Sequence, residues 1–243
     1  MENIFLSIII PAYNEASRLP GTLEKVFAFL ENQPYTSEVL VVENGSTDGT
    51  YRIAKSFQEK CDCLRVIKQD FPGKGKAVRT GMLQAHGTFR FMCDADLSMP
   101  IDELSRFLPP ALEDFDVAIA SREAPESVRY NEPFYRHLGG RLINTIIRLL
   151  ALPGLDDTQC GFKCFRAEVA EDIFKHQKID RWAFDVEVLF IAQKRGYRIV
   201  EIPISWYFNP ETKLRPLRDA LAMIIDIAKL KINNRRGFYD KED

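Results

Sequence analysis

The sequence has few of the features that mark membrane-spanning or secreted chains. No apolar run is long enough to cross a bilayer, so no transmembrane helix is expected. The N-terminus carries neither the basic segment nor the cleavage site of a secretory signal. The net charge is only −2, so the chain lacks the basic excess typical of nucleic-acid-binding proteins, and no nucleic-acid partner is expected.

Metal-binding cysteine pairs are missing as well. The chain has five cysteines, and none of their spacings is typical of a zinc site: Cys61, Cys63, Cys93, Cys160 and Cys164. They predict reduced thiols in a cytoplasmic protein. Neither repeats nor low-complexity linkers interrupt the 243 residues, which suffice for one α/β domain or two small ones.

The sequence does contain an alternation of apolar runs and amphipathic segments. Short β-branched runs predict strands near residues 7–10, 38–42, 64–68, 88–93 and 116–120. Helical periodicity follows at about 18–31, 48–59, 75–85, 101–112, 134–152, 184–195 and 217–232, with a compact segment at 156–165. Strands that are apolar on both faces predict a parallel sheet covered by helices. Ligands of such sheets bind beyond the carboxyl ends of the strands.

Two carboxylates, Asp94 and Asp96, follow directly after the fourth predicted strand. On an extended strand, side chains two residues apart point the same way, so both can reach one divalent cation. Hard oxygen ligands suit Mg²⁺ or Mn²⁺, and Mg²⁺ usually takes further oxygens from water or from a diphosphate. The alternative is an ordinary turn, since aspartate is common in turns.

Three further segments follow predicted strands at the same edge of the sheet: residues 11–15, 43–50 and 72–76. Tyr13 offers a face for stacking on a base, and Glu15 can accept hydrogen bonds from a ribose or base. Ser46 and Asp48 fit equally well as helix caps. Glycines alternate with lysines around Lys74, which favours phosphate binding, although the spacing is not that of a Walker A motif and a solvated loop stays the alternative.

Together these motifs resemble those of a known enzyme family. The segments PAYNE, VVENGSTDGT, GKGKAVRTGM and DADLSMP, in this order, resemble the family 2 glycosyltransferases of the GT-A fold. In the second half, DTQCGFK, WAFDVE and IPISW resemble the dolichyl-phosphate β-glucosyltransferase branch, whose pattern the dolichyl-phosphate mannose synthases share. The resemblance implies a Rossmann-like α/β fold, with a mostly parallel central sheet flanked by helices and C-terminal amphipathic helices. It also implies inverting transfer of a hexose from a nucleotide sugar to a polyprenyl phosphate.

The resemblance extends to individual donor-site residues. The positions that match the nucleotide-sugar site are Pro11, Tyr13, Glu15, Val42, Asn44, Ala95 and Lys213, and the phosphate-loop candidate Lys74 joins them. Asp94 and Asp96 match the motif that binds the metal and the diphosphate. Arg122 matches an arginine that faces the donor and acceptor phosphates.

Three departures from the family pattern bear on the donor. Glu43 and Asn44 stand in place of the usual pair of aspartates, which leaves the choice between UDP and GDP open. Ser98 stands where mannose synthases often have glutamine or histidine, so a third metal ligand stays open. Asn209 replaces an arginine of the mannose synthases, which favours UDP-glucose as the donor, with GDP-mannose second.

A polar stripe runs along the helix predicted at 134–152. Its members recur at helical spacing, opposite an apolar side: His137, Arg141, Asn144 and Arg148. A basic amphipathic helix suits a membrane surface, and a surface helix packed on the sheet is the alternative. With the resemblance, the candidates for holding the acceptor phosphate are Arg129, Arg136 and Arg141, because a guanidinium fork matches phosphate oxygens.

The last predicted helix, at 217–232, is apolar over a wide face. It is expected to be buried, to mediate a homo-oligomer, or to lie at a membrane interface. Many relatives carry transmembrane helices after the catalytic domain and this chain does not, so peripheral attachment at the cytoplasmic face of a membrane is expected. The expected organisation is a catalytic domain over 1–213, with a nucleotide-sugar half (1–122) and an acceptor half (123–213), followed by a helix and tail over 214–243.

The implied mechanism places Mg²⁺ or Mn²⁺ on the donor diphosphate through Asp94 and Asp96. Arg122 then positions the acceptor phosphate and screens its charge. A phosphate acceptor is already anionic and needs little help from a base; Asp157 is a candidate for orienting the acceptor or sugar, or for acting as a base. Two alternatives stand beside this one: a family 2 transferase with a saccharide acceptor, which needs a general base, and a non-catalytic nucleotide-sugar-binding module.

Overall fold

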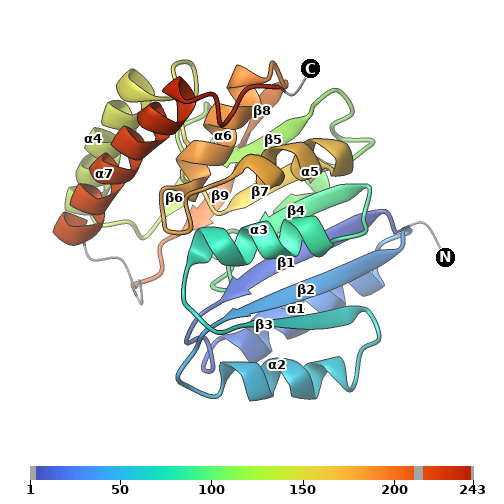
Figure 1. The fold of residues 1–243 in the computed structure, drawn as a ribbon. Coiled ribbons are helices and arrows are strands. Elements are labelled where there is room, and N and C mark those ends of the chain that lie inside the picture. Colours follow the sequence, from blue (N-terminus) through green and yellow to red (C-terminus); the bar gives the residue numbers. More distant parts are fainter. Residues whose placement is uncertain (1–3, 211–215, 242–243) are drawn as a thin grey trace.

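The computed structural model describes residues 4–210 and 216–241, in which helices cover both faces of a central sheet (Figure 1). Within these residues, seven strands form the sheet in the order β3-β2-β1-β4-β7-β5-β8. Their bounds are Leu6–Ala12 (β1), Ser37–Asn44 (β2), Leu64–Gln69 (β3), Phe89–Cys93 (β4), Val117–Ser121 (β5), Phe162–Arg166 (β7) and Ile199–Pro203 (β8). The strand predictions for the first half are therefore confirmed to within a few residues.

The pairing of the strands is mostly parallel, as the alternation of strands and helices predicted. β1 pairs in parallel with β2 and β4, β2 with β3, and β5 with β8. The exception is β7, which lies antiparallel between β4 and β5. This strand starts near the edge where the parallel strands end, so it brings the segment before it to that edge.

Alternate residues of the central strands pack into two different hydrophobic cores, because side chains along a strand point to opposite faces of the sheet. On one face, Ile8 and Ile10 pack with residues of three helices: α1 (Leu19–Glu31), α2 (Thr50–Gln58) and the short 3₁₀ helix η1 (Ile101–Phe107). On the other face, Ile9 belongs to the core formed with α3 (Lys74–Gln84), α5 (Ala167–His176) and α6 (Phe184–Lys194). Burial on both faces explains why these strands are continuously apolar.

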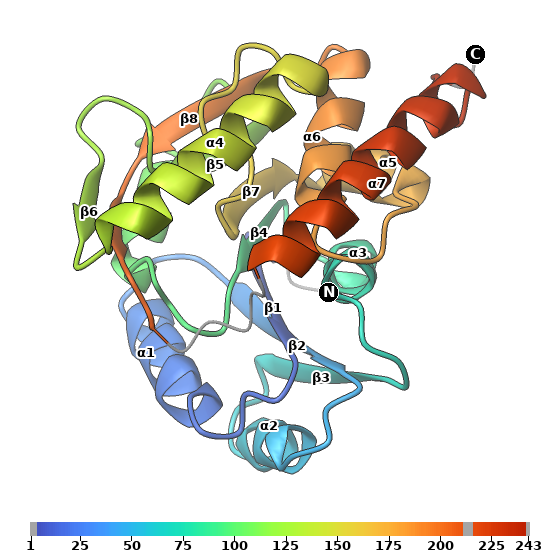
Figure 2. The same ribbon diagram turned by 90° about the vertical axis from the view of Figure 1, so that its left-hand side faces the viewer.

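Two long helices extend this second core. α4 (Phe134–Leu150) and α7 (Pro216–Arg235) lie side by side (Figures 1 and 2). α7 buries Met223, Ile227 and Leu230, so burial is confirmed for one face of the helix. Among the described residues, none of the helices combines the length and apolar character needed to cross a bilayer.

Several elements differ from the prediction. The helix expected at 101–112 is the 3₁₀ helix η1, which ends before Pro109 and Pro110, because proline cannot donate the hydrogen bond that continues a helix. The strands β7 and β8 and the helix α5 were not predicted. The same is true of a small parallel sheet formed by β6 (Val128–Tyr130) and β9 (Ser205–Tyr207).

The cysteines require one correction. Cys61 and Cys63 form a disulfide, so the expectation of five reduced thiols was wrong. Both residues lie in the connection between α2 and β3, where their Cα atoms are 5.3 Å apart, a separation that a disulfide can bridge. The free thiols of Cys93, Cys160 and Cys164 are buried.

Candidate active site

The loops that follow β1 and β2 are joined to each other by hydrogen bonds. The side-chain oxygen of Asn14 accepts a bond of 2.8 Å from the backbone N–H of Thr47, and the Asn14 N–H donates to Ser46 Oγ at 3.0 Å. The Glu15 N–H donates to Thr50 Oγ1 at 2.8 Å. Thus the first two sequence motifs form one structural unit, in which the ring of Tyr13 is partly exposed.

The third motif is attached to this unit through Asn44. The Asn44 side chain is buried at the end of β2, and its oxygen accepts a bond of 2.9 Å from the Gly73 N–H. Gly73 directly precedes α3, so this bond fixes the start of the helix and the position of Lys74. Asn44 therefore holds the loop that carries the phosphate-binding candidate Lys74, and it does so through an oxygen that acts only as an acceptor.

Asp94 and Asp96 lie in a turn after β4, and the expectation of an extended segment was wrong. The Leu97 N–H donates to the Asp94 carbonyl at 3.2 Å, and Leu97 has a φ of +44°, which is uncommon for a residue other than glycine. Asp94 Oδ1 lies 2.6 Å from Lys74 Nζ, and Asp96 Oδ1 accepts from the Ser98 N–H at 3.0 Å.

The two carboxylates interact electrostatically in spite of the turn. Burial, followed by the charge of Asp94, raises the pKa of Asp96. A divalent cation would relieve this repulsion, and the oxygen ligands suit Mg²⁺ or Mn²⁺. Within the described residues, no cluster of three or more acidic, histidine or cysteine side chains is placed to bind a metal. The aspartate pair therefore fits a metal that takes its other oxygens from water and a bound diphosphate.

Gly161 lies against the carboxyl group of Asp94. It directly precedes β7, whose Phe162 pairs with Cys93 of β4. A Cβ atom at position 161 would overlap with the carboxyl group of Asp94. Only glycine therefore leaves room for Asp94 in its present position. Sequence reasoning missed this role, because a single glycine in DTQCGFK gives no indication of what it packs against.

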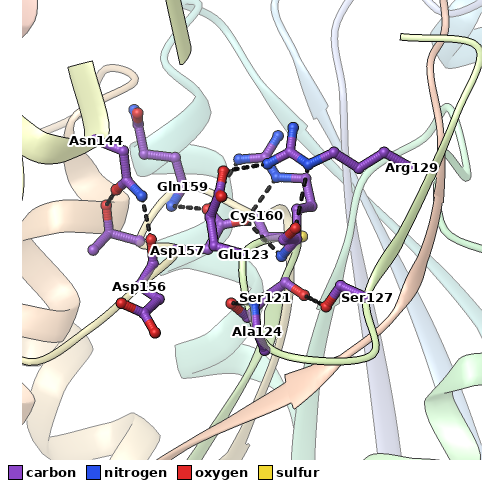
Figure 3. Close-up of polar contacts among 12 residues, drawn as sticks. Ser121, Glu123, Ala124, Ser127, Arg129, Asn144, Asp156, Asp157, Gln159 and Cys160 are labelled. Carbon is purple, nitrogen blue, oxygen red and sulfur yellow. Dashed lines mark hydrogen bonds and ion pairs between the residues drawn. The ribbon is translucent and has the colours of Figure 1, made fainter. Parts of the chain in front are cut away.

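Arg122 and Asp157 form a second charged centre. Arg122 Nε and Nη2 donate to the two oxygens of Asp157 at 2.6 and 2.9 Å, and the Arg122 backbone N–H donates to Oδ2 at 3.0 Å. The Asp157 side of this centre is drawn in Figure 3. Burial would raise the pKa of Asp157, but the Arg122 charge and these hydrogen bonds outweigh it and lower the pKa to about 2. Asp157 is therefore a poor base, and its contacts suit orientation of Arg122.

The loop that carries Asp157 is positioned by Glu201 of β8. The two oxygens of Glu201 accept from the N–H groups of Asp156 at 2.8 Å and Asp157 at 2.9 Å. On the other side, Ser127 Oγ donates to the Ser121 carbonyl at 2.6 Å and closes the turn that follows Arg122. Glu201 was not predicted as a functional residue, because it lies in a strand that the sequence pattern did not reveal.

Two of the three arginines predicted to hold the acceptor phosphate, Arg129 and Arg141, differ in exposure and in ion-pair partners. Arg129 is held by two carboxylates, Glu123 at 2.5 Å and Glu132 at 2.7 Å (Figure 3 shows the first). Arg141 is largely exposed and lies 3.9 Å from Glu123. The side chain of Arg136 and all of Lys213 lie outside the described residues, so their predicted roles stay predictions.

Arg141 lines an open hollow of about 160 Å³ beside the Arg122–Asp157 pair. The other lining residues come from the polar face of α4 and from its surroundings: Glu123, Asn144, Thr145, Arg148 and Asp156. Arg148 pairs with Asp156 at 2.9 Å. Three members of the predicted polar stripe, Arg141, Asn144 and Arg148, therefore face this hollow, whereas His137 pairs with Glu132. The volume of the hollow suits a phosphate group rather than a whole lipid.

The fold, with its mostly parallel sheet and an aspartate pair at the strand ends, defines a glycosyltransferase of the GT-A class. Comparison with known families agrees, since the family described as Glycosyl transferase family 2 matches residues 7–174. The chain belongs to this family.

Individual relatives are similar over nearly the whole chain. A dolichyl-phosphate beta-glucosyltransferase of Dictyostelium discoideum is 32% identical, covering 98% of this chain and 77% of the relative. Proteins of the same name from Drosophila melanogaster and Homo sapiens are 35% and 32% identical, covering 91% and 98% of this chain and 73% and 78% of each relative.

Solved structures support the fold. Glucosyl-3-phosphoglycerate synthase from Mycobacterium tuberculosis, in complex with Mn²⁺, UDP-glucose and phosphoglyceric acid, matches with a TM-score of 0.67 at 15% identity. The match covers 99% of this chain and 81% of that one. Mannosyl-3-phosphoglycerate synthase from Rubrobacter xylanophilus gives a TM-score of 0.61 at 16% identity, covering 99% and 77%. At these identities the likeness establishes the fold alone.

The contact between Gly161 and Asp94 generates the first prediction. Gly161→Ala should displace the Asp94 carboxylate and lower turnover by roughly 10²-fold, since misplacement of a catalytic group by about 1 Å has this effect. Gly21→Ala is the matched control, because Gly21 lies in α1 with no atom within 4 Å of an added Cβ. Steady-state kinetics and Mn²⁺ titration check the pair. Wild-type turnover and Mn²⁺ affinity in Gly161→Ala would contradict the assigned contact.

The Arg122–Asp157 pair predicts a pH dependence of stability. The pKa of Asp157 is lowered from 3.8 to about 2 on folding, so its contribution is present above pH 4 and is lost as the pH falls towards 2. That contribution is about 2 kcal/mol. Urea unfolding at pH 5 and pH 2.5 should therefore show a smaller loss of stability in Asp157→Asn than in wild type. Asp156→Asn, which removes a neighbouring exposed carboxylate, should retain the wild-type loss; equal losses in all three proteins would refute the assignment.

Proposed function

We propose that this protein is an inverting glucosyltransferase that moves glucose from UDP-glucose to a dolichyl or other polyprenyl phosphate. The observation that carries the proposal is the presence of two charged centres near one edge of the sheet. Asp94 and Asp96 make up the first, and the ion pair of Arg122 with Asp157 makes up the second. The names of the relatives support glucose and dolichyl phosphate as the substrates.

On the donor side, Asp94 and Asp96 would hold Mg²⁺ or Mn²⁺. When bound, the metal supplies Lewis-acid stabilisation for the departing nucleoside diphosphate. The M. tuberculosis neighbour crystallised with Mn²⁺ and UDP-glucose supports a divalent metal and a UDP donor. In this proposal Tyr13 stacks on the base, and Asn44 acts indirectly by holding Gly73 ahead of Lys74. The remaining donor positions line the nucleotide: Pro11, Glu15, Val42, Lys74, Ala95 and Lys213.

On the acceptor side, Arg122 orients the phosphate that attacks the sugar. Its bidentate bond to Asp157 fixes the plane of the guanidinium, which is the property that phosphate recognition requires. Arg141 and Arg148 line the neighbouring hollow together with Glu123 and Asp156, so an acceptor phosphate would replace these carboxylates as the partner of the two arginines. A phosphate acceptor is already an anion, so the reaction proceeds without a strong base, in agreement with the low pKa of about 2 of Asp157.

A saccharide acceptor is less well supported. Attack by a sugar hydroxyl requires a general base near the reacting centre. Asp157, the base candidate from the sequence, has a pKa lowered to about 2 by the charge of Arg122, which outweighs the opposing effect of burial. The retained aspartate pair, together with Arg122, likewise disfavours a non-catalytic module, in which neither a metal nor an acceptor phosphate would need to be held.

We further propose peripheral attachment to the cytoplasmic face of a membrane. α4 and α7 lie side by side and both expose large apolar residues: Leu149, Leu150, Leu221, Ile224 and Ile225. The hollow with Arg141 opens beside α4, so a membrane in contact with these helices would bring lipid phosphates near it. Amphipathic helices of this kind bind interfaces through buried apolar area.

A transfer assay tests the proposed reaction. Purified protein with Mn²⁺ and a short polyprenyl phosphate should use UDP-glucose in preference to GDP-mannose and UDP-galactose. Asp96→Asn should lower turnover by roughly 10²-fold or more. Arg141→Lys should raise the KM for polyprenyl phosphate and leave the KM for the donor unchanged, because lysine keeps the charge and loses the planar fork. Transfer to a saccharide and not to the lipid phosphate would overturn the proposal.

Liposome flotation tests the membrane contact. Leu149→Ser combined with Leu221→Ser should lower the vesicle-bound fraction by roughly tenfold, because each exposed leucine loses its apolar contact. Vesicles of phosphatidylcholine with phosphatidylserine are suitable, and serine adds no charge. Leu83→Ser, which changes an exposed leucine of α3, is the control. UDP binding should be unaffected in all variants; unchanged flotation of the double variant would refute the contact.

A further inference from the structure

Lys74 forms an ion pair with Asp94, one of the two proposed metal ligands. Its Nζ lies 2.6 Å from Asp94 Oδ1, and the lysine side chain is only 17% exposed. The ring of Trp182 covers the ammonium, with its centroid 5.0 Å from Nζ. This pair therefore differs from a surface ion pair, because it is enclosed on several sides and little screened by solvent.

Neighbouring residues restrict the positions that the Lys74 and Asp94 side chains can adopt. Gly161 borders the Asp94 carboxyl group closely enough that no Cβ would fit. A second carboxylate near Lys74, that of Asp185, is bound at 2.6 Å by the fully buried Lys163. Asp94 is therefore the direct carboxylate partner of Lys74 in the structure, and it is also one of the two proposed metal ligands.

Lys74 also lies at the N-terminus of α3, where a diphosphate would bind. The N-terminal N–H groups of a helix and its dipole favour an anion, and Gly73 before Lys74 is held in place by Asn44. A lysine side chain is flexible and carries a compact charge, so it can exchange one anionic partner for another with little strain. The Asp94 carboxylate and the diphosphate of the donor thus compete for the ammonium group of Lys74.

We propose that Lys74 competes with the divalent cation for Asp94 and releases it when a nucleoside diphosphate binds. In the nucleotide-free protein, the ammonium neutralises Asp94 and keeps the affinity for metal low. A bound diphosphate attracts Lys74, and Asp94 then becomes available to the metal. The metal and the nucleotide therefore bind cooperatively, and the order favours nucleotide before metal. This inference rests on the proposed use of Asp94 and Asp96 as metal ligands.

Titration with Mn²⁺ in the absence and presence of UDP tests the competition without any sugar transfer. Free Mn²⁺ is measured by electron paramagnetic resonance. Wild type should bind Mn²⁺ weakly alone and on the order of tenfold or more tightly with saturating UDP, within the usual range for coupling between two ligands. Lys74→Met should bind Mn²⁺ alone more tightly than wild type. UDP should then enhance the binding by a smaller factor, because only the direct coordination of the metal by the diphosphate remains.

Two variants serve as controls. Lys74→Arg keeps the positive charge and should bind Mn²⁺ alone as weakly as wild type, which separates the loss of charge from a general disturbance of the loop. Lys175→Met removes a lysine paired with Glu171 on the surface of α5 and should leave both affinities unchanged.

The outcomes separate the competition from the proposed reaction. If Lys74→Met binds Mn²⁺ alone no more tightly than wild type, the competition is refuted, even in an active glucosyltransferase. If Lys74→Met fails to fold, binding of Mn²⁺ alone by Lys74→Gln no more tightly than by wild type would refute it equally. If the Mn²⁺ pattern is as expected and no glucose is transferred, the competition holds and the proposed reaction is wrong.

Discussion

The site depends on one strand that runs against the others. β7 lies antiparallel between β4 and β5, and its register sets Phe162 opposite Cys93. This pairing places Gly161 against Asp94 and brings the Asp157 loop to the end of β5, where Arg122 follows. Without that insertion, the segment from Asp157 to Gly161 would not reach the ends of β4 and β5. The backbone hydrogen bonds of β7 therefore help to set the distance between the Asp94/Asp96 turn and the Arg122–Asp157 pair.

Three ion pairs lie on this strand or near the edge of the sheet to which it leads. Lys163 on β7 is fully buried and pairs with Asp185 of α6, Arg122 pairs with Asp157, and Lys74 pairs with Asp94. Removing one member of a buried pair leaves an uncompensated charge, which costs about 3–5 kcal/mol. Each pair joins two parts of the chain that are distant in the sequence: β7 to α6, the end of β5 to the Asp157 loop, and α3 to the turn after β4. The polar interior and the candidate site are thus parts of one network.

The sequence predicted the parallel half of the fold well, because its strands are short, β-branched and separated by helical patterns. It also identified the edge at which the motifs gather. The geometry of Asp94 and Asp96 was predicted wrongly, since the alternation of side chains along a strand does not continue into the turn after Cys93. β7 was not predicted because the buried Lys163 interrupts the apolar pattern of the strand. The partner of Lys163, Asp185, is 22 residues away in the sequence. Contacts such as that of Glu201 with the Asp157 loop depend on distant pairing, which local patterns do not encode.

The joined loops after β1 and β2 have a consequence for how the protein diversifies. Asn14 bonds to Ser46 and Thr47, and Glu15 bonds to Thr50, so the two motifs hold each other's conformation through their own atoms. In the proposed donor site, a nucleotide would meet a surface already in place, and the entropy of ordering the loops would be lost during folding rather than on binding. The helices and loops of the second half could then vary without disturbing these two loops. Such modularity is consistent with a fold that this chain shares with glucosyl-3-phosphoglycerate synthase at only 15% sequence identity.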